Sequence, residues 1–264
     1  METFTARQGL NWIKAGWRLF VRSPLTWIFA VITYWLIMAL AGLIPYLGTL
    51  LATLFIPAFA VSFMAISRDL DQSRKVEPGL IFAGFRRNLG VLVRLGGIYL
   101  AATLIILMVS QFADGGTLLK WMLANQPPAE ADLGASGIGN AILLAMVLYL
   151  PVLMAFWFAP VLVAWHDMSA TKSLFYSFFA CLRNWRAFAA YGLAWVLLGG
   201  LLPGTLGTAL AIAISGGTPN PAVSQTLLFI FLLMLVPTLF ASFYASYRDI
   251  FAAPTVSPSP ELEG

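Results

Sequence analysis

The chain has 264 residues, of which 60% are apolar and only 10% are charged, and its mean hydropathy is +0.86. A soluble domain has roughly 45–50% apolar and about 25% charged residues, so this composition excludes an ordinary soluble domain and indicates a membrane protein. The net charge of +4 is too small an excess to predict a nucleic-acid partner, and we expect none. The single cysteine and single histidine exclude an intrachain disulfide, a two-cysteine redox motif and a Cys/His zinc site.

Four stretches of the chain contain no Asp, Glu, Lys, Arg or His, and they are 45, 19, 33 and 61 residues long. A membrane-spanning helix needs about 20 residues, and turn formers divide the first and the last stretch in two. The chain therefore has six predicted spans, at residues 24–44, 48–66, 91–112, 139–165, 187–203 and 226–247. These segments are apolar on every face, which predicts helices and not the alternating strands of a barrel.

Basic residues are distributed unequally between the two sides of the predicted membrane. Fourteen of the 15 Lys and Arg residues lie on the side that carries both termini, whereas the opposite connections hold only Lys120. By the positive-inside rule, both termini are predicted to be cytoplasmic, and residues 113–136 and 215–224 to lie outside. No signal peptide is expected, because Lys14, Arg18 and Arg22 lie within residues 6–22, where its apolar region would have to be.

The ends of the second and sixth spans have nearly the same sequence. Proline, a Ser-Phe pair, alanine and an Arg-Asp pair fall in register between residues 57–69 and 237–249, and the fourth span ends in a His-Asp pair. The predicted fold is an all-α polytopic membrane helix bundle, with six transmembrane helices as three parallel two-helix repeats, each preceded by an interfacial amphipathic helix. The predicted organisation is a single integral membrane domain at 1–252, with repeats at about 6–70, 77–168 and 170–250, and a disordered cytoplasmic tail at 253–264.

The repeated dipeptides form a candidate structural motif at the cytoplasmic boundary. Its residues are Arg68, Asp69, His166, Asp167, Arg248 and Asp249. A boundary arginine can extend its charge to the headgroups and the adjacent aspartate can accept hydrogen bonds, so a ring of three dipeptides would hold the cytoplasmic ends together. The alternative is that His166 and Asp167 handle a proton or contact a metal. We favour the structural interpretation because His166 takes the place of an arginine in the repeat.

Residues 6–22 form the clearest amphipathic stretch. Its basic stripe contains the candidate headgroup-facing residues Arg7, Lys14, Arg18 and Arg22. A basic stripe opposite tryptophans suits anionic membrane lipids at the cytoplasmic face. The plainer interpretation, which we favour, is a helix that anchors the first span and packs on its neighbours. Residues 79–87 and 171–183 are its predicted counterparts, and Ser23, Asn88 and Asn184 are predicted N-caps of the odd-numbered spans.

Four prolines, at positions 57, 151, 160 and 237, lie inside even-numbered spans. We favour fixed kinks that close the bundle over hinges at a transport site. Every ionisable residue lies at a span end or outside, whereas ion- and proton-coupled transporters usually hold one near mid-membrane. No catalytic or nucleotide-binding motif occurs, so we predict no enzyme, no catalytic residue, no metal site and no cofactor.

Two short aromatic-rich motifs carry a family resemblance: Gly16-Trp17-Arg18-Leu19-Phe20 with Ser23-Pro24-Leu25, and Arg183-Asn184-Trp185. The chain resembles an uncharacterised proteobacterial family of six-helix integral inner-membrane proteins, over residues 8 to about 251. It is more distantly similar to the membrane domain that accompanies some glycerophosphodiester phosphodiesterases. The phosphodiesterase activity belongs to a separate soluble domain that this chain is expected to lack. The resemblance therefore implies a multi-pass protein of the bacterial inner membrane and no activity.

These observations predict a non-enzymatic inner-membrane protein that acts as a scaffold or a lipid-associated envelope factor. Its predicted partners are membrane lipids, with a second copy or another membrane protein as further possibilities. The alternative is a permease or channel-like transporter for a neutral or amphipathic solute. A central cavity lined by Ser62, Ser242, Asn140 and aromatic side chains would favour transport, whereas a bundle filled by Phe, Leu and Trp would favour the scaffold.

Overall fold

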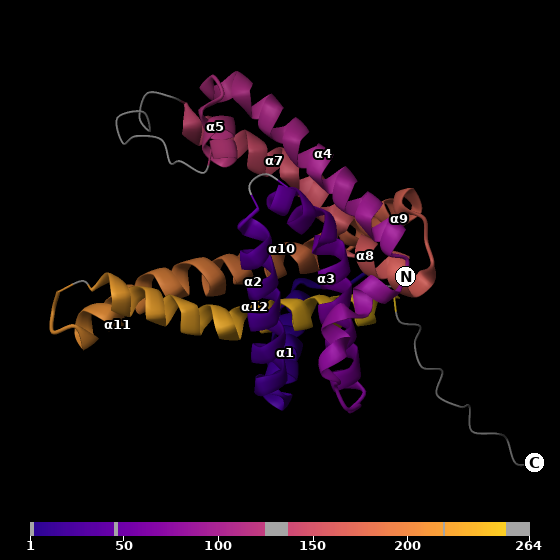
Figure 1. Ribbon diagram of the computed structural model, residues 1–264, viewed down its shortest axis with the longest axis horizontal. Helices are drawn as coiled ribbons and strands as arrows, with labels where there is room; N and C mark the ends of the chain where they lie inside the picture. Colours follow the sequence, from indigo (N-terminus) through magenta and orange to yellow (C-terminus); the bar gives the residue numbers. More distant parts are fainter. Residues whose placement is uncertain (1–2, 45–46, 125–136, 219, 252–264) are drawn as a thin grey trace, which may run out of the picture. The chain divides into compact units, whose positions relative to one another are not determined.

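The computed structural model of this chain describes residues 3–44, 47–124, 137–218 and 220–251, and all regular structure in these residues is helical (Figure 1). Six helical segments are long and apolar enough to cross a membrane, which confirms the predicted all-α polytopic class. The segments are Pro24–Gly42, Leu47–Asp71, Leu89–Asp114, Ile138–His166, Trp185–Ile214 and Pro221–Phe251. The predicted tail at 253–264 and the second half of the predicted outer loop at 113–136, residues 125–136, lie outside the described residues.

The chain folds into two compact units. Unit 1 contains residues 1–22 and 186–264, and unit 2 contains residues 23–185. Unit 1 thus combines the first amphipathic helix of the chain with the last two spans. The single domain and the repeat boundaries read from the sequence stay predictions.

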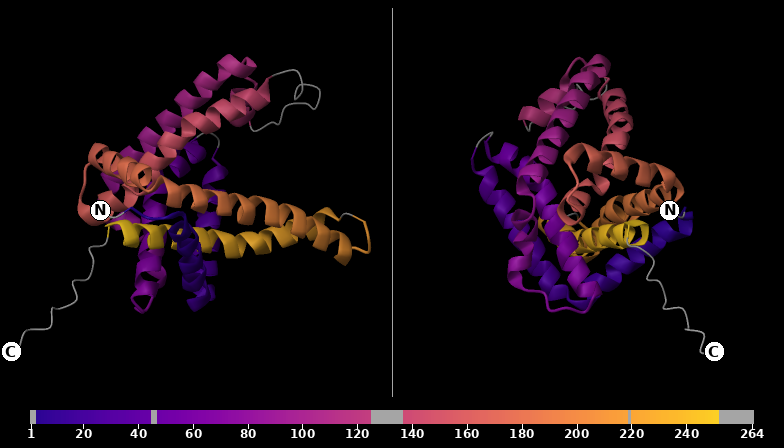
Figure 2. Two further views of the ribbon diagram at one scale, coloured as in Figure 1. Left: turned by 180° about the vertical axis from the view of Figure 1, so that it is seen from behind. Right: turned by 90° about the vertical axis from the view of Figure 1, so that its right-hand side faces the viewer.

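Unit 1 is built on a long helical hairpin. One arm is continuous through α10 (Trp185–Val196), the π-helical segment η2 (Leu197–Leu206) and α11 (Gly207–Ile214). The other arm is α12 (Pro221–Phe251), which lies beside the first arm in both views of Figure 2. Helix α1 (Ala6–Arg22) packs along the C-terminal half of α12. The middle of the fifth span, Leu197–Leu206, is thus wound as a π-helix, which is wider than an α-helix.

Unit 2 contains the other four spans and two of the short helices that precede spans. Its elements are α2 (Pro24–Gly42), α3 (Leu47–Asp71), the 3₁₀ helix η1 (Pro78–Arg86), α4 (Leu89–Asp114), α5 (Thr117–Ala124), α7 (Ile138–Trp157), α8 (Ala159–His166) and α9 (Ala170–Arg183). Helices α4 and α7 run side by side, and α3 packs against η1 and α4. The predicted helices at 79–87 and 171–183 correspond to η1 and α9, although η1 has the tighter 3₁₀ winding.

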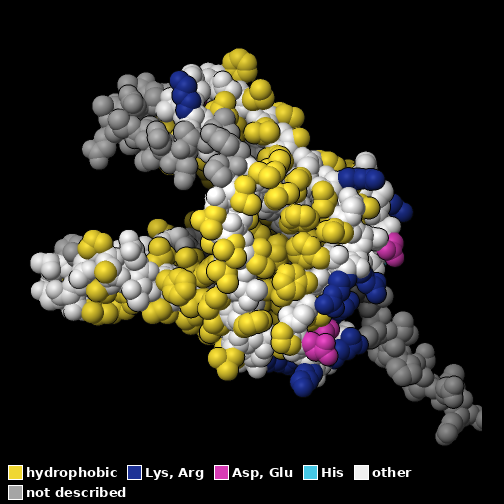
Figure 3. All heavy atoms as spheres, viewed as in Figure 1, with side chains coloured by type: hydrophobic (Ala, Val, Ile, Leu, Met, Phe, Trp, Pro, Cys, Tyr) yellow, Lys and Arg dark blue, Asp and Glu magenta, His cyan; other side chains and the backbone are white. Residues whose placement is uncertain are grey.

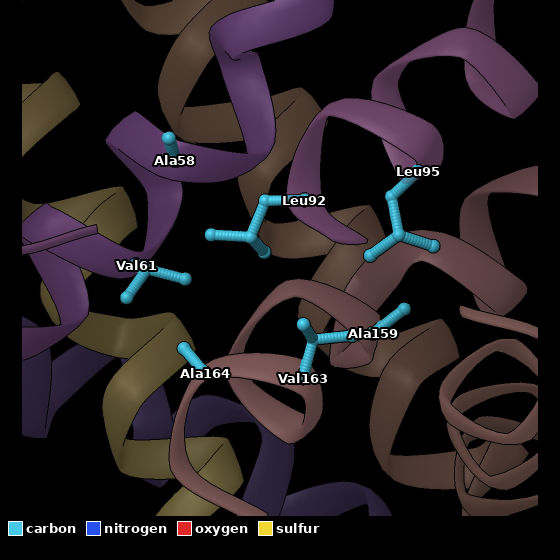
Figure 4. Packing of buried hydrophobic residues seen from close by; sticks show 7 residues of the cluster. All are labelled: Ala58, Val61, Leu92, Leu95, Ala159, Val163 and Ala164. Carbon is cyan, nitrogen blue, oxygen red and sulfur yellow. The ribbon is translucent and has the colours of Figure 1, made fainter. Parts of the chain in front are cut away.

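Small and branched apolar side chains form the core where α3, α4 and α8 meet. Figure 4 shows this cluster, whose members are Ala58, Val61, Leu92, Leu95, Ala159, Val163 and Ala164. All seven are almost completely inaccessible to solvent. Small residues at helix contacts let backbones approach closely, which gives dispersion contacts that do not depend on exclusion from water.

A glycine on a short helix contacts the segment that follows a span proline in each unit. In unit 2, a Cβ at Gly84 of η1 would collide with the carbonyl oxygen of Ala58, and the Gly84 N–H donates to Ser62 Oγ at 3.0 Å. In unit 1, a Cβ at Gly16 of α1 would lie 2.5 Å from the Thr238 carbonyl oxygen and 2.7 Å from the Ser242 nitrogen. Ala58 and Thr238 directly follow Pro57 and Pro237. The sequence match between the two span ends therefore coincides with a matching packing contact.

Helix α9 contacts the fourth span, α7 and α8, through a serine where η1 and α1 use a glycine. Ser177 Oγ accepts from the Phe158 N–H at 2.9 Å and donates to the Met154 carbonyl at 2.8 Å. The hydroxyl thus stands between a donor and an acceptor that are four residues apart, as in the α-helical hydrogen-bond ladder. A side chain inserted in this way breaks a helix, and the break separates α7 from α8.

The predicted N-caps occupy the expected positions but form other hydrogen bonds. Ser23 and Asn88 precede α2 and α4, yet neither side chain accepts from a first-turn amide. Ser23 Oγ instead lies 2.7 Å from Thr26 Oγ1. Asn88 Nδ2 donates to the Val163 carbonyl at 3.0 Å and to Asp167 Oδ1 at 2.7 Å. The capping prediction was wrong at these two positions, and at Asn88 the backbone is left-handed, with φ of +50°, and not in the extended conformation usual for an N-cap. The Asn88 amide instead joins the start of α4 to the end of α8.

Large apolar side chains are exposed along the spans. On the face shown in Figure 3, many hydrophobic side chains are exposed on the described surface. Leu36 in α2, Leu150 in α7 and Val196 in α10 are each more than half exposed. A continuous apolar surface of this extent marks contact with a membrane or a partner, and six spans identify the membrane as the main one.

Candidate functional site

One aspartate and one tryptophan hold α1 against the end of α12 in unit 1. Trp12 is 1% exposed, and its ring packs 5.2 Å from the Phe188 ring, centroid to centroid. Its Nε1–H donates to Asp249 Oδ2 at 2.9 Å, and Gln8 Nε2 donates to the same oxygen at 2.6 Å. Asp249 therefore accepts two hydrogen bonds from α1, which makes the short helix part of the packed unit.

Two glycines bring the backbone of α1 close to the hairpin. A Cβ at Gly9 would collide with the Ala187 carbonyl, and one at Gly16 would crowd Ser242. Ser242 Oγ forms a 2.6 Å hydrogen bond with Tyr191 Oη, which joins α12 to α10 directly beneath this contact. The buried face of α1 is consequently set close to both arms of the hairpin.

A groove of about 700 Å³ runs between α1 and the two arms of the hairpin. The wall from α10 and η2 consists of Trp195, Leu198 and Leu202. The wall from α12 consists of Phe231, Met234, Leu235 and Thr238, and the edge from α1 consists of Asn11, Ile13, Lys14, Trp17 and Arg18. Its volume lies within the range of about 300–1,000 Å³ that is usual for small-molecule sites.

Charged groups occur on one side of this groove. The two hairpin walls are apolar except for two side chains: the Thr238 hydroxyl donates to the Met234 carbonyl at 2.7 Å, and the Trp195 indole N–H is buried without a hydrogen-bond partner among the described residues. The α1 edge carries two cationic side chains and one amide, and Lys14 and Arg18 are both exposed. The groove is therefore amphipathic, with a long apolar part between spans and a positively charged edge on the short helix.

A curated protein matches the chain over nearly its full length. The chain is similar to a probable inner membrane protein of Burkholderia thailandensis, with 38% identity over 253 residues that cover 94% of this chain and 92% of that protein. This chain belongs to the same family of inner-membrane proteins. No protein-family model matches it, and no solved structure does. The chain is thus a multi-pass inner-membrane protein.

The four candidate headgroup-facing residues of this inner-membrane protein are all exposed on α1, but only two of them line the groove. Lys14 and Arg18 do so, whereas Arg7 and Arg22 do not. Trp17, which lies between Lys14 and Arg18 in the sequence, is 42% exposed and also lines the groove. Sequence reasoning missed the walls, because Leu198 and Phe231 look like any other residue of an apolar span.

The three aspartates of the repeated dipeptides have different partners. Asp69 Oδ1 lies 3.9 Å from Arg68 Nε and 3.8 Å from Arg74 Nη1. Asp167 accepts from Asn88, and Asp249 accepts from α1 and lies 3.4 Å from Arg248 Nε. Each aspartate joins a span end to a nearby segment of its own unit. Their arrangement in one ring at a common depth stays a prediction.

His166 and Asp167 end α8 and are both exposed. Asp167 has a φ of +50°, a left-handed conformation that aspartate and asparagine tolerate better than most residues. Within the described ranges, no group of three or more His, Cys, Asp or Glu side chains could hold a metal ion. The left-handed backbone of Asp167 and its bond to Asn88 end α8, and the interpretation of the pair as a structural boundary motif stays a prediction.

Proposed function

We propose that this protein is a non-enzymatic inner-membrane protein that binds an anionic phospholipid in the groove of unit 1. The observation that carries the proposal is the division of this groove into apolar walls on two spans and a cationic edge on α1. Acyl chains would lie along the walls, and the headgroup phosphate would meet Lys14 and Arg18. Such a site suits a lipid-associated envelope factor or a scaffold that keeps lipid as part of its fold.

The energetics of the two parts of the groove favour one amphipathic molecule. Each buried methylene contributes about 0.8 kcal/mol relative to water, but a lipid already in a bilayer gains little from apolar contact alone. Selectivity must therefore come from the headgroup. Arg18 offers a planar fork of donors that matches a phosphate, and Lys14 adds a second charge on the same face of α1. Anionic headgroups are thus preferred over zwitterionic ones.

We place α1 and the groove edge at the cytoplasmic side, with both termini in the cytoplasm. The support is the concentration of Lys and Arg on that side of the spans. Reporter fusions at Gln72, Thr171 and Asn220 test the orientation. We expect cytoplasmic activity at Gln72 and Thr171 and periplasmic activity at Asn220, and a periplasmic reporter at Gln72 would overturn the six-span topology.

We favour this function over the permease alternative because the polar side chains suggested for a solute path have other roles. Ser62 donates to the Ala58 carbonyl and accepts from Gly84, Ser242 bonds to Tyr191, and Asn140 is exposed. Between α2 and α3, aromatic rings fill the contact, with Tyr34 packed edge-on against Phe59 and Phe63.

The experiment measures retention of phosphatidylglycerol and phosphatidylcholine by native mass spectrometry of the full chain in mild detergent. The wild type is expected to retain phosphatidylglycerol preferentially. The double variant Lys14→Gln with Arg18→Gln should lose this preference, because both cationic side chains of the groove edge are removed.

A control on the same helix separates the groove from a general effect of charge. Arg7→Gln with Arg22→Gln also removes two positive charges from α1, but neither of these residues lines the groove. The control should keep the preference for phosphatidylglycerol. An equal loss in both double variants, or no preference in the wild type, would contradict the proposal.

A further inference from the structure

A second basic pocket lies in unit 2, where the ends of α3, η1 and α8 meet. It has a volume of about 170 Å³. Its polar side chains are Arg68 from α3, Arg87 from the residue after η1, and Trp165 from α8, and the remainder of its lining is apolar side chains of α3 and η1. Three separate segments thus bring two arginines and a tryptophan to the lining of one small space.

Trp165 fixes the orientation of one of these guanidinium groups. The Arg68 Cζ lies 4.5 Å from the centroid of the Trp165 ring, so the cation rests on an aromatic face. Stacking holds the planar fork in place while its edge stays available for hydrogen bonds. The Arg68 Nε is buried and lies 3.9 Å from Asp69 Oδ1, and neither atom has a hydrogen-bond partner among the residues that the structure describes. This nitrogen therefore has a carboxylate of the protein beside it, and a ligand would bind the other donors of the two arginines.

The local charge of the pocket is positive. Asp69 is the carboxylate that pairs with Arg68, at 3.9 Å, but the same oxygen lies 3.8 Å from Arg74 and is shared between the two. Arg87 is exposed and forms no ion pair with a described residue. One shared carboxylate therefore leaves an excess of cationic charge around the space between Arg68 and Arg87.

We propose that this pocket binds a terminal phosphate group between Arg68 and Arg87. Two arginine forks can each donate two parallel hydrogen bonds to a tetrahedral oxyanion, which is the geometry that guanidinium recognises best. The small volume admits the phosphate and leaves the rest of a larger ligand outside. The group can come from inorganic phosphate or from the headgroup of phosphatidic acid, since both present the same oxyanion. This site is separate from the groove of unit 1 and does not depend on the lipid proposed there.

The test has two arms on the full chain in phosphatidylcholine nanodiscs. The first titrates inorganic phosphate against chloride at equal ionic strength and follows the thermal unfolding temperature. The second replaces part of the phosphatidylcholine by phosphatidic acid without free phosphate. We expect saturable stabilisation in at least one arm. Stabilisation by phosphate identifies a soluble ligand, and stabilisation by phosphatidic acid alone identifies the lipid headgroup.

Neighbouring arginines supply a matched control. Arg87→Gln is expected to weaken phosphate binding by about tenfold or more, because a hydrogen-bonded charge pair contributes at least that much. Arg86→Gln changes the adjacent residue, which is exposed and does not line the pocket, and should leave the affinity unchanged. Arg68→Lys keeps the charge but removes the planar fork, so it should weaken binding while the protein stays folded.

Two outcomes would overturn the proposal. The first is an equal effect of Arg86→Gln and Arg87→Gln, which would show general electrostatic attraction and not a site. The second is the lack of saturable stabilisation in both arms by a wild-type protein that elutes as a single folded species. The variant Lys14→Gln with Arg18→Gln should bind phosphate at this pocket as the wild type does.

Discussion

The contact of η1 with α3 in unit 2 and the contact of α1 with α12 in unit 1 share one geometry but are stabilised differently. Both use a glycine against the turn after a proline. In unit 2, the span serine Ser62 accepts a hydrogen bond from the glycine N–H itself. In unit 1, the corresponding Ser242 bonds to Tyr191, and α1 is held by Asp249 through Gln8 and Trp12.

The reason for the difference lies in the winding of the two short helices. Gly84 belongs to a 3₁₀ helix and directs its N–H to the span, whereas Gly16 lies in the middle of a 17-residue α-helix whose amides are bonded within the helix. A helix without free amides must be attached by side chains. The comparison shows that a repeated steric contact can be kept while the polar bonds around it are replaced.

The largest expected effect comes from adding a methyl group to the glycines. Gly84→Ala would place Cβ against a backbone oxygen that no rotamer change can move, so we expect a loss of about 3 kcal/mol or more, at the upper end of overpacking costs. Gly16→Ala should be somewhat milder, since its closest contact is 2.5 Å. Thermal unfolding in detergent measures both.

Helical glycines in open positions are the controls for this pair. Gly90 in α4 and Gly192 in α10 have no atom within 4 Å of an added Cβ. Alanine at either site should be neutral or should stabilise by up to about 1 kcal/mol through helix propensity. A loss at Gly90 or Gly192 as large as that at Gly84 would show that the close contacts are not the cause.

The next effect separates Asp249 from Asp69. Asp249→Asn weakens hydrogen bonds at 2.6 and 2.9 Å to a carboxylate, and bonds to charged groups contribute about 1.5–3 kcal/mol. Asp69→Asn removes only ion pairs at 3.8–3.9 Å with half-exposed arginines, where about 0–1 kcal/mol is typical. We therefore expect a fall of several degrees in unfolding temperature for Asp249→Asn and a smaller one for Asp69→Asn.

Combining these two variants tests the predicted ring of dipeptides. If the aspartates share a network, the double variant should lose more stability than the sum of the single variants. Additive losses would instead indicate that each aspartate acts within its own unit. Labelling of cysteines introduced at 69, 167 and 249 reports whether the three positions have one depth.

The serine bonds give a smaller effect with a distinguishing pattern. Ser62→Ala removes the acceptor of the buried Gly84 N–H, which should cost about 1–3 kcal/mol. The donor in this bond is a backbone group, so no second side-chain variant can test it. Ser242→Ala and Tyr191→Phe break the same 2.6 Å bond. Their double variant should therefore cost clearly less than the sum of the two, as measured by a double-mutant cycle in chemical unfolding. Strict additivity would exclude this bond as a contributor to stability.

The smallest effect concerns Cys181 on α9, the third short helix. Cys181 is 2% exposed, and burial raises the pKa of its thiol above the ordinary value of about 8.5. The neutral thiol therefore persists at high pH, and maleimide labelling of the folded protein should stay slow between about pH 7 and pH 9. Rapid labelling that rises with pH would show that α9 does not cover this residue, whereas unfolded protein should be labelled readily.

The sequence by itself determined the class of protein, the six spans and the positions of the short helices. Runs without charge and of sufficient length have no stable alternative to spanning helices, because lipid offers no partners for backbone polar groups. It also singled out the basic stripe of Arg7, Lys14, Arg18 and Arg22, of which the structure places Lys14 and Arg18 at the groove. The match between residues 57–69 and 237–249 predicted a repeat, and in the structure each of the two segments packs against a glycine of a short helix.

Only the tertiary structure decided which residues cooperate. The sequence does not show that Asp249 accepts hydrogen bonds from a helix about 240 positions earlier in the chain. It also does not show that Asn88 binds the end of α8 instead of capping α4, or that the Arg68 guanidinium lies over the Trp165 ring. Both the groove and the basic pocket depend on such pairings. The physical reason is that apolar span residues are alike in chemistry, so their partners are selected by shape and by a few hydrogen bonds that become identifiable only when the helices are packed together.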